Sequence, residues 1–427
     1  MKIYLILTSL LICSGLFAQN KEELSKIKSL KSEIIPLNLN ENSEFIQNKK
    51  KLKQYIADAS IVLLGEESHG DGTAFKTKSE LVKFLHQELG FNVIAFESSM
   101  YLAEKSFQNI QNKEDAKLEL RRSITPLWGW AVEVQPLINY IDEQKQSTHP
   151  LIVSGFDHQE ISQTDRETFP FELYNSMEKE NINFKDQEEQ NAFFKFYALL
   201  SSQFYGRNEN LTLDSLNYLL STFNNAGARI LADLEKLEGK DMELLTQSMR
   251  NKLAVATNAV YRKVNDSRFN EYTRDSVMAE NIIWLKEKRY PNQKIIIWAA
   301  NLHNARNAGS PYKTTMGDYI YRKYKDELYS IGFVANKGEM GTVQMQNSRP
   351  IEPAKENTLE YLFSKTEVPN FFLDFKSFKK TKKGKWLNNN LDMRPFGYME
   401  QNKNWTDIFD AVIFNNEMGR VNLFKVK

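Results

Sequence analysis

The chain has almost no cysteine, since Cys13 is the only one among 427 residues. A disulfide needs two cysteines, so this chain cannot form an internal disulfide. A cysteine-based metal site needs several cysteines, so that class of site is excluded as well. Stability must therefore come from a hydrophobic core, and the 41% of hydrophobic residues is sufficient for a large one. We expect one large domain with insertions, or two closely packed domains.

The sequence also lacks an excess of charge of one sign. It has 56 basic and 55 acidic residues, which gives a formal net charge of +1. A balanced total provides no strong overall field for nucleic acid or for an anionic membrane. We therefore expect a small-molecule substrate and no nucleic-acid partner, and the sequence does not indicate an oligomeric state.

Long apolar runs are absent except at the N-terminus. There, Lys2 is followed by the apolar stretch Ile3–Phe17 and by the small residue Ala18. This order is typical of a secretory signal peptide, and we predict a signal over residues 1–18 with cleavage after Ala18. The alternative is a lipoprotein signal acylated at Cys13, but the bulky Ile12 before it disfavours this. We expect an exported protein, periplasmic or secreted, that has no membrane segment after cleavage.

Several standard catalytic motifs are missing. The sequence has no G-x-S-x-G elbow, no H-E-x-x-H helix, no phosphate-binding P-loop and no dinucleotide fingerprint. A serine-hydrolase triad on an α/β sheet, a helix-borne zinc protease site and a nucleotide cofactor are therefore unsupported. We expect no cofactor, although a divalent metal is left open.

Apolar strands are the main feature that is present. Four are expected, at Ile61–Leu64, Asn92–Phe96, Leu151–Ser154 and Lys294–Ala299. The helix Thr73–Leu89 separates the first two, and such a strand–helix–strand unit predicts parallel, adjacent strands. Further strands are expected at Tyr329–Ala335, Thr342–Gln346, Phe371–Asp374 and Ala411–Phe414.

The rest of the chain is mainly helical in pattern. Residues 19–57 are predicted as a helical lead-in, with a helix over Phe45–Ala57 that begins after Asn42. A large helical insertion is expected at about 160–290, inside a domain that spans 58–427. The predicted fold class is α/β, with a mostly parallel central sheet flanked by helices and a large all-helical insertion.

Chemistry-bearing residues follow the four apolar strands. They are Glu66 and His69, then Glu97, then Asp157 and His158, and finally Asn301 and His303. Ligands of open parallel sheets bind outside the carboxyl ends of the strands, where these side chains are expected to meet. The chain has only five histidines, and three of them lie at such positions. The other two, His86 and His149, are interpreted as surface residues.

Histidines and carboxylates without an evident nucleophile point to water as the attacking group. A histidine can take a proton from water near neutral pH, and a carboxylate on its other ring nitrogen would hold the tautomer. A cation such as Lys78, Arg306 or a second histidine could stabilise an oxyanion. The same residues could instead bind a metal, or the cleft could bind a ligand without chemistry.

These residues also fall into blocks that resemble the erythromycin esterase family over most of residues 55–340. The blocks are Gly65-Glu66-x-x-His69-Gly70 with Phe75 and Lys78, Gly90-Phe91, Ala95-Phe96-Glu97, Trp130-x-x-Glu133, Gly155-x-Asp157, Arg274-Asp275, Met278-Ala279-x-Asn281, Trp298-Ala299-x-Asn301-x-His303-x-x-Arg306 and Met316-Gly317. The resemblance implies hydrolysis of a macrolide lactone by water.

The resemblance also implies roles for individual residues. His69 matches the general base, Glu66 and Glu97 match active-site carboxylates, and His303 matches a histidine of the last long block. The expected substrate contacts are Asp157, His158, Asn301, Arg306, Trp130 and Glu133. Two positions depart from the family pattern: Ala300 replaces a histidine, and Lys78 replaces an arginine and so lacks its bidentate fork.

Overall fold

The central sheet of the computed structural model is mostly parallel. The structure describes residues 21–425, except 41–42, 112, 114–115, 161, 204–210 and 310–313. Within that part, the strands run in the order β1-β8-β11-β6-β2-β5-β3-β4, with β7 paired to β6. They are β1 (Ile35–Pro36), β2 (Ile61–Leu64), β3 (Phe91–Ser99), β4 (Ile152–Asp157), β5 (Lys294–Trp298), β6 (Leu328–Met340), β7 (Arg349–Ile351), β8 (Asn370–Asp374) and β11 (Ala411–Met418).

Neighbouring strands from β11 to β4 in this order pair in parallel, whereas β8 pairs antiparallel with both β11 and β1, and β7 pairs antiparallel with β6. A separate hairpin consists of β9 (Leu391–Phe396) and β10 (Met399–Lys403). The expected fold class is confirmed: a parallel sheet with helices on both faces and a helical region between β4 and β5.

One detail of the predicted topology is wrong. We expected β2 and β3 to be neighbours, but β5 lies between them, with Trp298 aligned to Leu64 on one side and to Phe96 on the other. The helix between β2 and β3 is long enough to cross over one strand. The carboxyl ends of all three strands still meet at one edge, which is what the site requires.

Successive side chains of the central strands point to opposite faces of the sheet and pack into two different hydrophobic cores. Val62, Leu64 and Trp298 face one core with α2 (Lys49–Ile56), α3 (Gly72–Leu89) and α7 (Gln135–Gln144). Their neighbours Ile61, Leu63 and Ile297 face the other core, which contains the helices between β4 and β5. Strands that are apolar on both faces read as continuous apolar runs, which is why the sequence revealed them.

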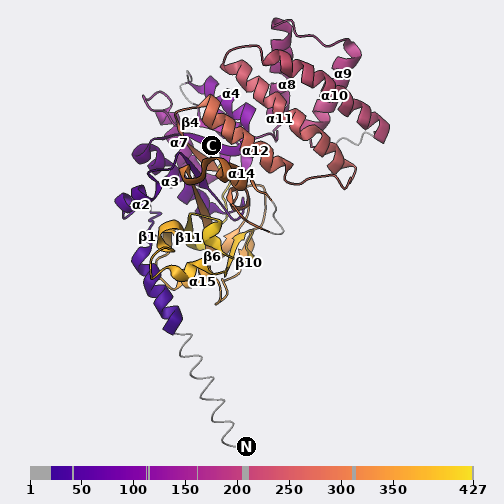
Figure 1. The fold of residues 1–427 in the computed structure, drawn as a ribbon. Coiled ribbons are helices and arrows are strands. Elements are labelled where there is room, and N and C mark those ends of the chain that lie inside the picture. Colours follow the sequence, from indigo (N-terminus) through magenta and orange to yellow (C-terminus); the bar gives the residue numbers. More distant parts are fainter. Residues whose placement is uncertain are drawn as a thin grey trace, which may run out of the picture.

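The region between β4 and β5 contains α8 (Gln163–Lys179), α9 (Gln187–Ser201), α10 (Leu213–Leu234), α11 (Lys240–Lys263) and α12 (Thr273–Trp284). Figure 1 shows α8–α11 grouped at one end of the molecule, while α12 leads back to the sheet. Between β3 and β4 lie α4 (Met100–Ile110), α5 (Lys117–Ser123), α6 (Pro126–Gly129) and α7.

After β5 come the short α13 (Asn301–Asn304) and α14 (Met316–Tyr324), and nearer the C-terminus α15 (Leu359–Ser364) and α16 (Phe375–Phe378). Within the described residues, no helix combines the length and apolarity needed to cross a bilayer.

Three local predictions need correction. The segment Thr342–Gln346 forms turns instead of a strand. Helix α2 begins at Lys49, because the side chain of Asn48 accepts a hydrogen bond from the Lys51 N–H and caps it there. His86 is buried, not at the surface, and its ring bonds the Tyr140 hydroxyl and the His149 carbonyl. The predicted leader lies outside the described residues.

Candidate active site

Glu66 is the centre of a first cluster, in the turn that follows β2. Its side chain is completely buried and meets three donors from three different elements. His69 Nδ1 lies 2.8 Å from Oε1, Trp128 Nε1 lies 3.2 Å from the same oxygen, and Lys78 Nζ of α3 lies 2.5 Å from Oε2. We call these four residues the Glu66 cluster. A buried carboxylate is stable only with such partners, so its orientation is fixed by them.

Lys78 is a buried cation within this cluster. It is fully enclosed, and its ammonium lies 4.2 Å from the centre of the Trp298 ring. Burial lowers the pKa of Lys78 to about 8, while the charge of Glu66 opposes that shift. Lys78 therefore remains protonated at neutral pH and holds the Glu66 side chain in place through their ion pair.

His69 is the exposed member of the cluster, with 35% of its side chain accessible. Burial of part of the ring disfavours its charge. The hydrogen bond that His69 donates to Glu66 and the charges of Glu97 and Glu66 outweigh this effect, so the pKa of His69 is raised. Among the described residues, no hydrogen-bond partner faces the other ring nitrogen, Nε2. The neutral ring can therefore accept a proton there while Glu66 holds the tautomer.

Arg274 of α12 is the centre of a second cluster. Its guanidinium bonds Asp157 at the end of β4 (2.6 Å) and Glu97 in β3 (2.8 Å). Both carboxylates are buried. Burial alone would raise their pKa values, but the charges of Arg274 and the nearby histidines hold both pKa values below their usual range.

His303 of α13 completes the second cluster, in which its ring lies between acids and the guanidinium. Nδ1 is 3.0 Å from Asp275 Oδ1, and Nε2 is 3.4 Å from Glu97 Oε1 and 3.2 Å from Arg274 Nη1. Burial opposes its charge, yet the charges of Glu97 and Asp275 raise the pKa of His303. We call Arg274, Glu97, Asp157, His303 and Asp275 the Arg274 cluster.

The backbone after β5 connects the two clusters. The Ala300 N–H donates to Glu97 Oε2 (3.2 Å), and the Asn301 N–H donates to the Glu66 carbonyl (2.8 Å). The Ala299 carbonyl lies 3.4 Å from Lys78 Nζ. The alanine at position 300 therefore still supplies a polar contact to the site, through its main chain.

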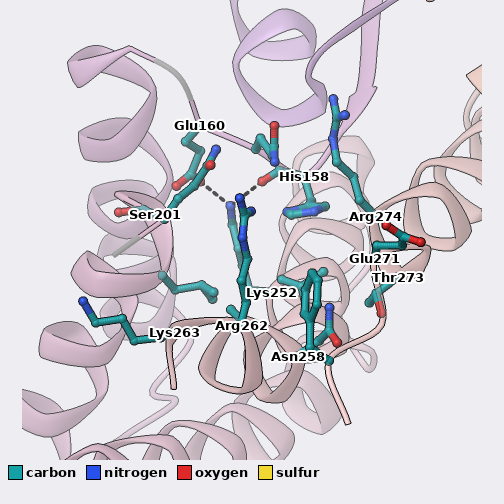
Figure 2. Close-up of a pocket in the computed structure, with 16 residues that line it drawn as sticks. His158, Glu160, Ser201, Lys252, Asn258, Arg262, Lys263, Glu271, Thr273 and Arg274 are labelled. Carbon is teal, nitrogen blue, oxygen red and sulfur yellow. Dashed lines mark hydrogen bonds and ion pairs between the residues drawn. The ribbon is translucent and has the colours of Figure 1, made fainter. Parts of the chain in front are cut away.

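A cavity of about 600 Å3 lies beside the Arg274 cluster. Figure 2 shows Lys252 bonded to the Glu160 carboxylate and to the His158 carbonyl in its wall, with Arg274 at one edge. Burial, helped by the charges of Lys252 and Arg274, lowers the pKa of His158 to about 4 despite the neighbouring Asp157. His158 is therefore a neutral lining group at neutral pH. The volume suits a drug-sized ligand.

The structure brings together six of the expected site residues and places a seventh in the cavity wall. Glu66, His69, Lys78, Glu97, Asp157 and His303 belong to the two clusters, and His158 lines the cavity.

The other four expected residues are engaged elsewhere. Asn301 is buried and exchanges hydrogen bonds with the backbone of Phe333 and Pro395. Arg306 forms a buried ion pair with Asp410. Glu133 accepts hydrogen bonds from Asn422, and the Trp130 carbonyl accepts one from the Phe424 N–H.

Three residues of the clusters were not expected from the sequence. Arg274 and Asp275 stand in one of the resembling blocks, which was the available signal, but they do not follow a strand directly. Trp128 lies in the same Leu-Trp-Gly-Trp segment as Trp130, and the sequence alone does not show which indole points inward.

The described residues contain no group of three or more His, Cys, Asp or Glu side chains arranged to hold a metal ion. The carboxylates are instead occupied by cations of the chain, as Glu66 is by Lys78 and Glu97 by Arg274.

Two curated proteins are similar to this chain over most of its length. "Putative hydrolase YbfO" of Bacillus subtilis is 27% identical over 383 residues, covering 85% of this chain and 84% of that protein. "Erythromycin esterase type II" of Escherichia coli is 21% identical over 380 residues, with 82% and 88% coverage.

Solved structures show the same fold. A Bacillus cereus protein superposes with a TM-score of 0.77 at 19% identity, covering 94% of this chain and 99% of that one. A mutant of the erythromycin esterase EreC in its open conformation superposes with a TM-score of 0.69 at 16% identity, with 92% and 99% coverage. The erythromycin esterase family model matches residues 86–418. With fold and sequence in agreement over most of its length, this chain belongs to the erythromycin esterase family and is a hydrolase of that kind.

Proposed function

We propose that this protein hydrolyses a carboxylic ester or lactone by attack of water, with His69 as the general base. The carrying observation is the geometry of His69: Nδ1 is held 2.8 Å from the buried Glu66, while the ring is one-third exposed on its other side. A water hydrogen-bonded to Nε2 would lose its proton as it attacks the acyl carbon. Glu66 would then stabilise the imidazolium that forms.

The Arg274 cluster is better placed than Lys78 or Arg306 to stabilise the oxyanion. Lys78 is fully enclosed and bound to Glu66, and Arg306 is held by Asp410, so neither cation faces a substrate. Arg274 and His303 keep 28% and 17% of their side chains accessible. The charge of Arg274 also acts on the ring of His69, and His303 contacts Arg274 at 3.2 Å. In this proposal Lys78 positions Glu66, while Arg274 and His303 stabilise the developing negative charge.

The substrate class proposed first is a macrolide lactone, with simpler carboxylic esters as the alternative. Support comes from two relatives that are named as erythromycin esterases. It also comes from the cavity of about 600 Å3 that Arg274 borders. The missing side-chain polarity at Ala300 would favour a non-catalytic binding protein, but the Ala300 N–H still donates to Glu97, which weakens that alternative.

The test is incubation of the purified protein with a panel of macrolides and simple esters in water enriched in oxygen-18. Hydrolysis at the acyl carbon adds one water to the substrate and places the heavy oxygen in the carboxylate product. Ligand binding without any product, measured with the same panel, would favour a binding protein instead. We also propose that no metal is required, so activity should persist after exhaustive chelation. Activity lost on chelation and restored by one metal would contradict this.

Export is a separate proposal that rests on residues 1–18. Expression in a bacterial host with the full chain should yield a mature protein that begins at Gln19, as read by N-terminal sequencing. A product that retains Met1, or one acylated at Cys13, would contradict it.

A further inference from the structure

A groove of about 440 Å3 lies between the helix over residues 21–33 and the segment 376–388. Four lysines line it, Lys26, Lys28, Lys382 and Lys383, together with Trp386 and a single acid, Glu22. In Figure 1 the helix 21–33 lies at the opposite end of the molecule from α8–α11. The groove is therefore distinct from the cavity beside Arg274. We call it the lysine groove.

The balanced net charge of the whole chain conceals a strong local excess here. Residues 376–385 contain six lysines and no acidic residue. Two of them, Lys376 and Lys379, face Asp326 and Asp407. Within the described residues, no carboxylate lies within ion-pair distance of Lys28, Lys382 or Lys383. Lys26 is paired with Glu22, so the charge that the lysine groove presents comes from the other three lysines.

Apolar groups accompany the lysines. Leu24 is 61% exposed and lies one helical turn before Lys28, on the same side of the helix. Trp386 is half-buried, with Lys26 located 5.6 Å from its ring centre. Lysines beside an exposed leucine and a tryptophan are the combination found where proteins lie against a membrane interface.

We propose that the lysine groove and Leu24 form a peripheral docking surface for anionic lipid headgroups. Lysine is a compact point charge that suits the phosphates of a fluid lipid surface, whereas base-specific contacts to nucleic acids most often use the planar fork of arginine. Neither residues 21–33 nor residues 376–388 contain an arginine. Docking at this end would leave the cavity beside Arg274 facing away from the lipid.

The test is co-sedimentation of the mature protein with phosphatidylcholine vesicles that contain or lack phosphatidylglycerol. Binding should require phosphatidylglycerol and should be lost when salt is raised to about 0.5 M, because salt screens exposed charges. The double variant Lys382→Gln, Lys383→Gln should bind about thirtyfold more weakly, since each lysine near an anionic surface contributes about 1 kcal/mol. Leu24→Ser should also weaken binding.

A matched control is the double variant Lys236→Gln, Lys288→Gln, which removes the same charge from two exposed positions outside the groove. It should bind vesicles like the parent. The proposal is overturned if binding ignores phosphatidylglycerol, if the control loses binding as much as the groove variant, or if a single-stranded oligonucleotide binds the groove as tightly as the vesicles do. Ester hydrolysis in solution is measured independently, so its absence would not affect this result.

Discussion

The Glu66 cluster and the Arg274 cluster have opposite arrangements of hydrogen-bond donors and acceptors. In the Glu66 cluster, three donors converge on one carboxylate, and one of those donors is an accessible histidine. In the Arg274 cluster, carboxylates converge on one guanidinium and on a histidine whose two ring nitrogens are both engaged. The first arrangement leaves Nε2 of His69 available for a proton, and the second holds several buried charged groups in a fixed geometry. We therefore assign proton transfer to one cluster and charge stabilisation and rigidity to the other.

The largest effect is expected from removing the available nitrogen of the Glu66 cluster. His69→Gln should lower kcat by about 10²–10⁴-fold, the usual contribution of a general base. Thermal unfolding should change little, because the ring is one-third exposed. His149→Gln is the control, since His149 is exposed and lies in neither cluster. Turnover of His69→Gln equal to that of the control would refute the mechanism.

Breaking the Arg274 cluster should instead damage the fold. Arg274→Gln leaves the buried Glu97 and Asp157 without their cation, and such a change typically costs about 3–5 kcal/mol of stability. Urea unfolding at neutral pH measures it. The difference should shrink in acid, because carboxylates with lowered pKa values stabilise the fold above their unfolded pKa and lose that contribution as they become protonated.

Arg268→Gln is the matched control for this prediction. Arg268 pairs with Asp266 at the surface, and such exposed pairs contribute little to stability because water and salt screen them. If both arginine variants lost the same stability, the buried Arg274 cluster would contribute no more to stability than an ordinary surface ion pair.

The pH profile should distinguish the two clusters more finely. His69 acts as a base only when neutral, and its raised pKa places the rising limb of kcat/KM above pH 6.5. Glu66→Gln removes the hydrogen-bonded charge that raises this pKa while burial remains, so the limb should move to lower pH as the rate falls. Glu133→Gln, a carboxylate bonded to Asn422, should leave the limb in place. If the rising limb does not move in Glu66→Gln, Glu66 does not set the pKa of the catalytic base.

The smallest effect is expected at the connection between the clusters. Ala300→Ser retains the N–H that donates to Glu97, so kcat/KM should stay within about threefold of the parent, less than the loss of one hydrogen bond would cause. Ala300→Pro removes that N–H and should lower kcat/KM clearly more than the serine variant does. Equal kinetics for the two variants would show that this main-chain contact does not matter.

The sequence was sufficient for the buried parallel strands and for one edge of the site. Runs such as Ile61–Leu64 are apolar on both faces of the sheet, so they can be recognised as strands in the sequence. The acids and histidines directly after them could then be placed at the strand ends. The order of the strands was not predictable in the same way. Nothing local to β5 shows that it inserts between β2 and β3, because that position is decided by packing between distant segments.

The contacts of long side chains were also beyond the sequence. Arg306 was expected in the site because it follows the fourth strand and belongs to a resembling block, yet a carboxylate more than one hundred residues later binds its guanidinium. Asn301 follows a strand as a site residue would, but its amide joins two backbone segments. Arg274 reaches Glu97 and Asp157 from a helix far along the chain, so only the folded structure reveals the centre of the second cluster.

The peptide N–H of Ala300 has a consequence for how relatives of this protein are compared. Alignments record side chains, whereas this contact belongs to a group that every amino acid except proline carries. Position 300 can therefore take many residue types while the hydrogen bond to Glu97 is kept, so the loss of a polar side chain there is not by itself evidence that a relative is inactive. The informative substitution at that position would be the imino acid.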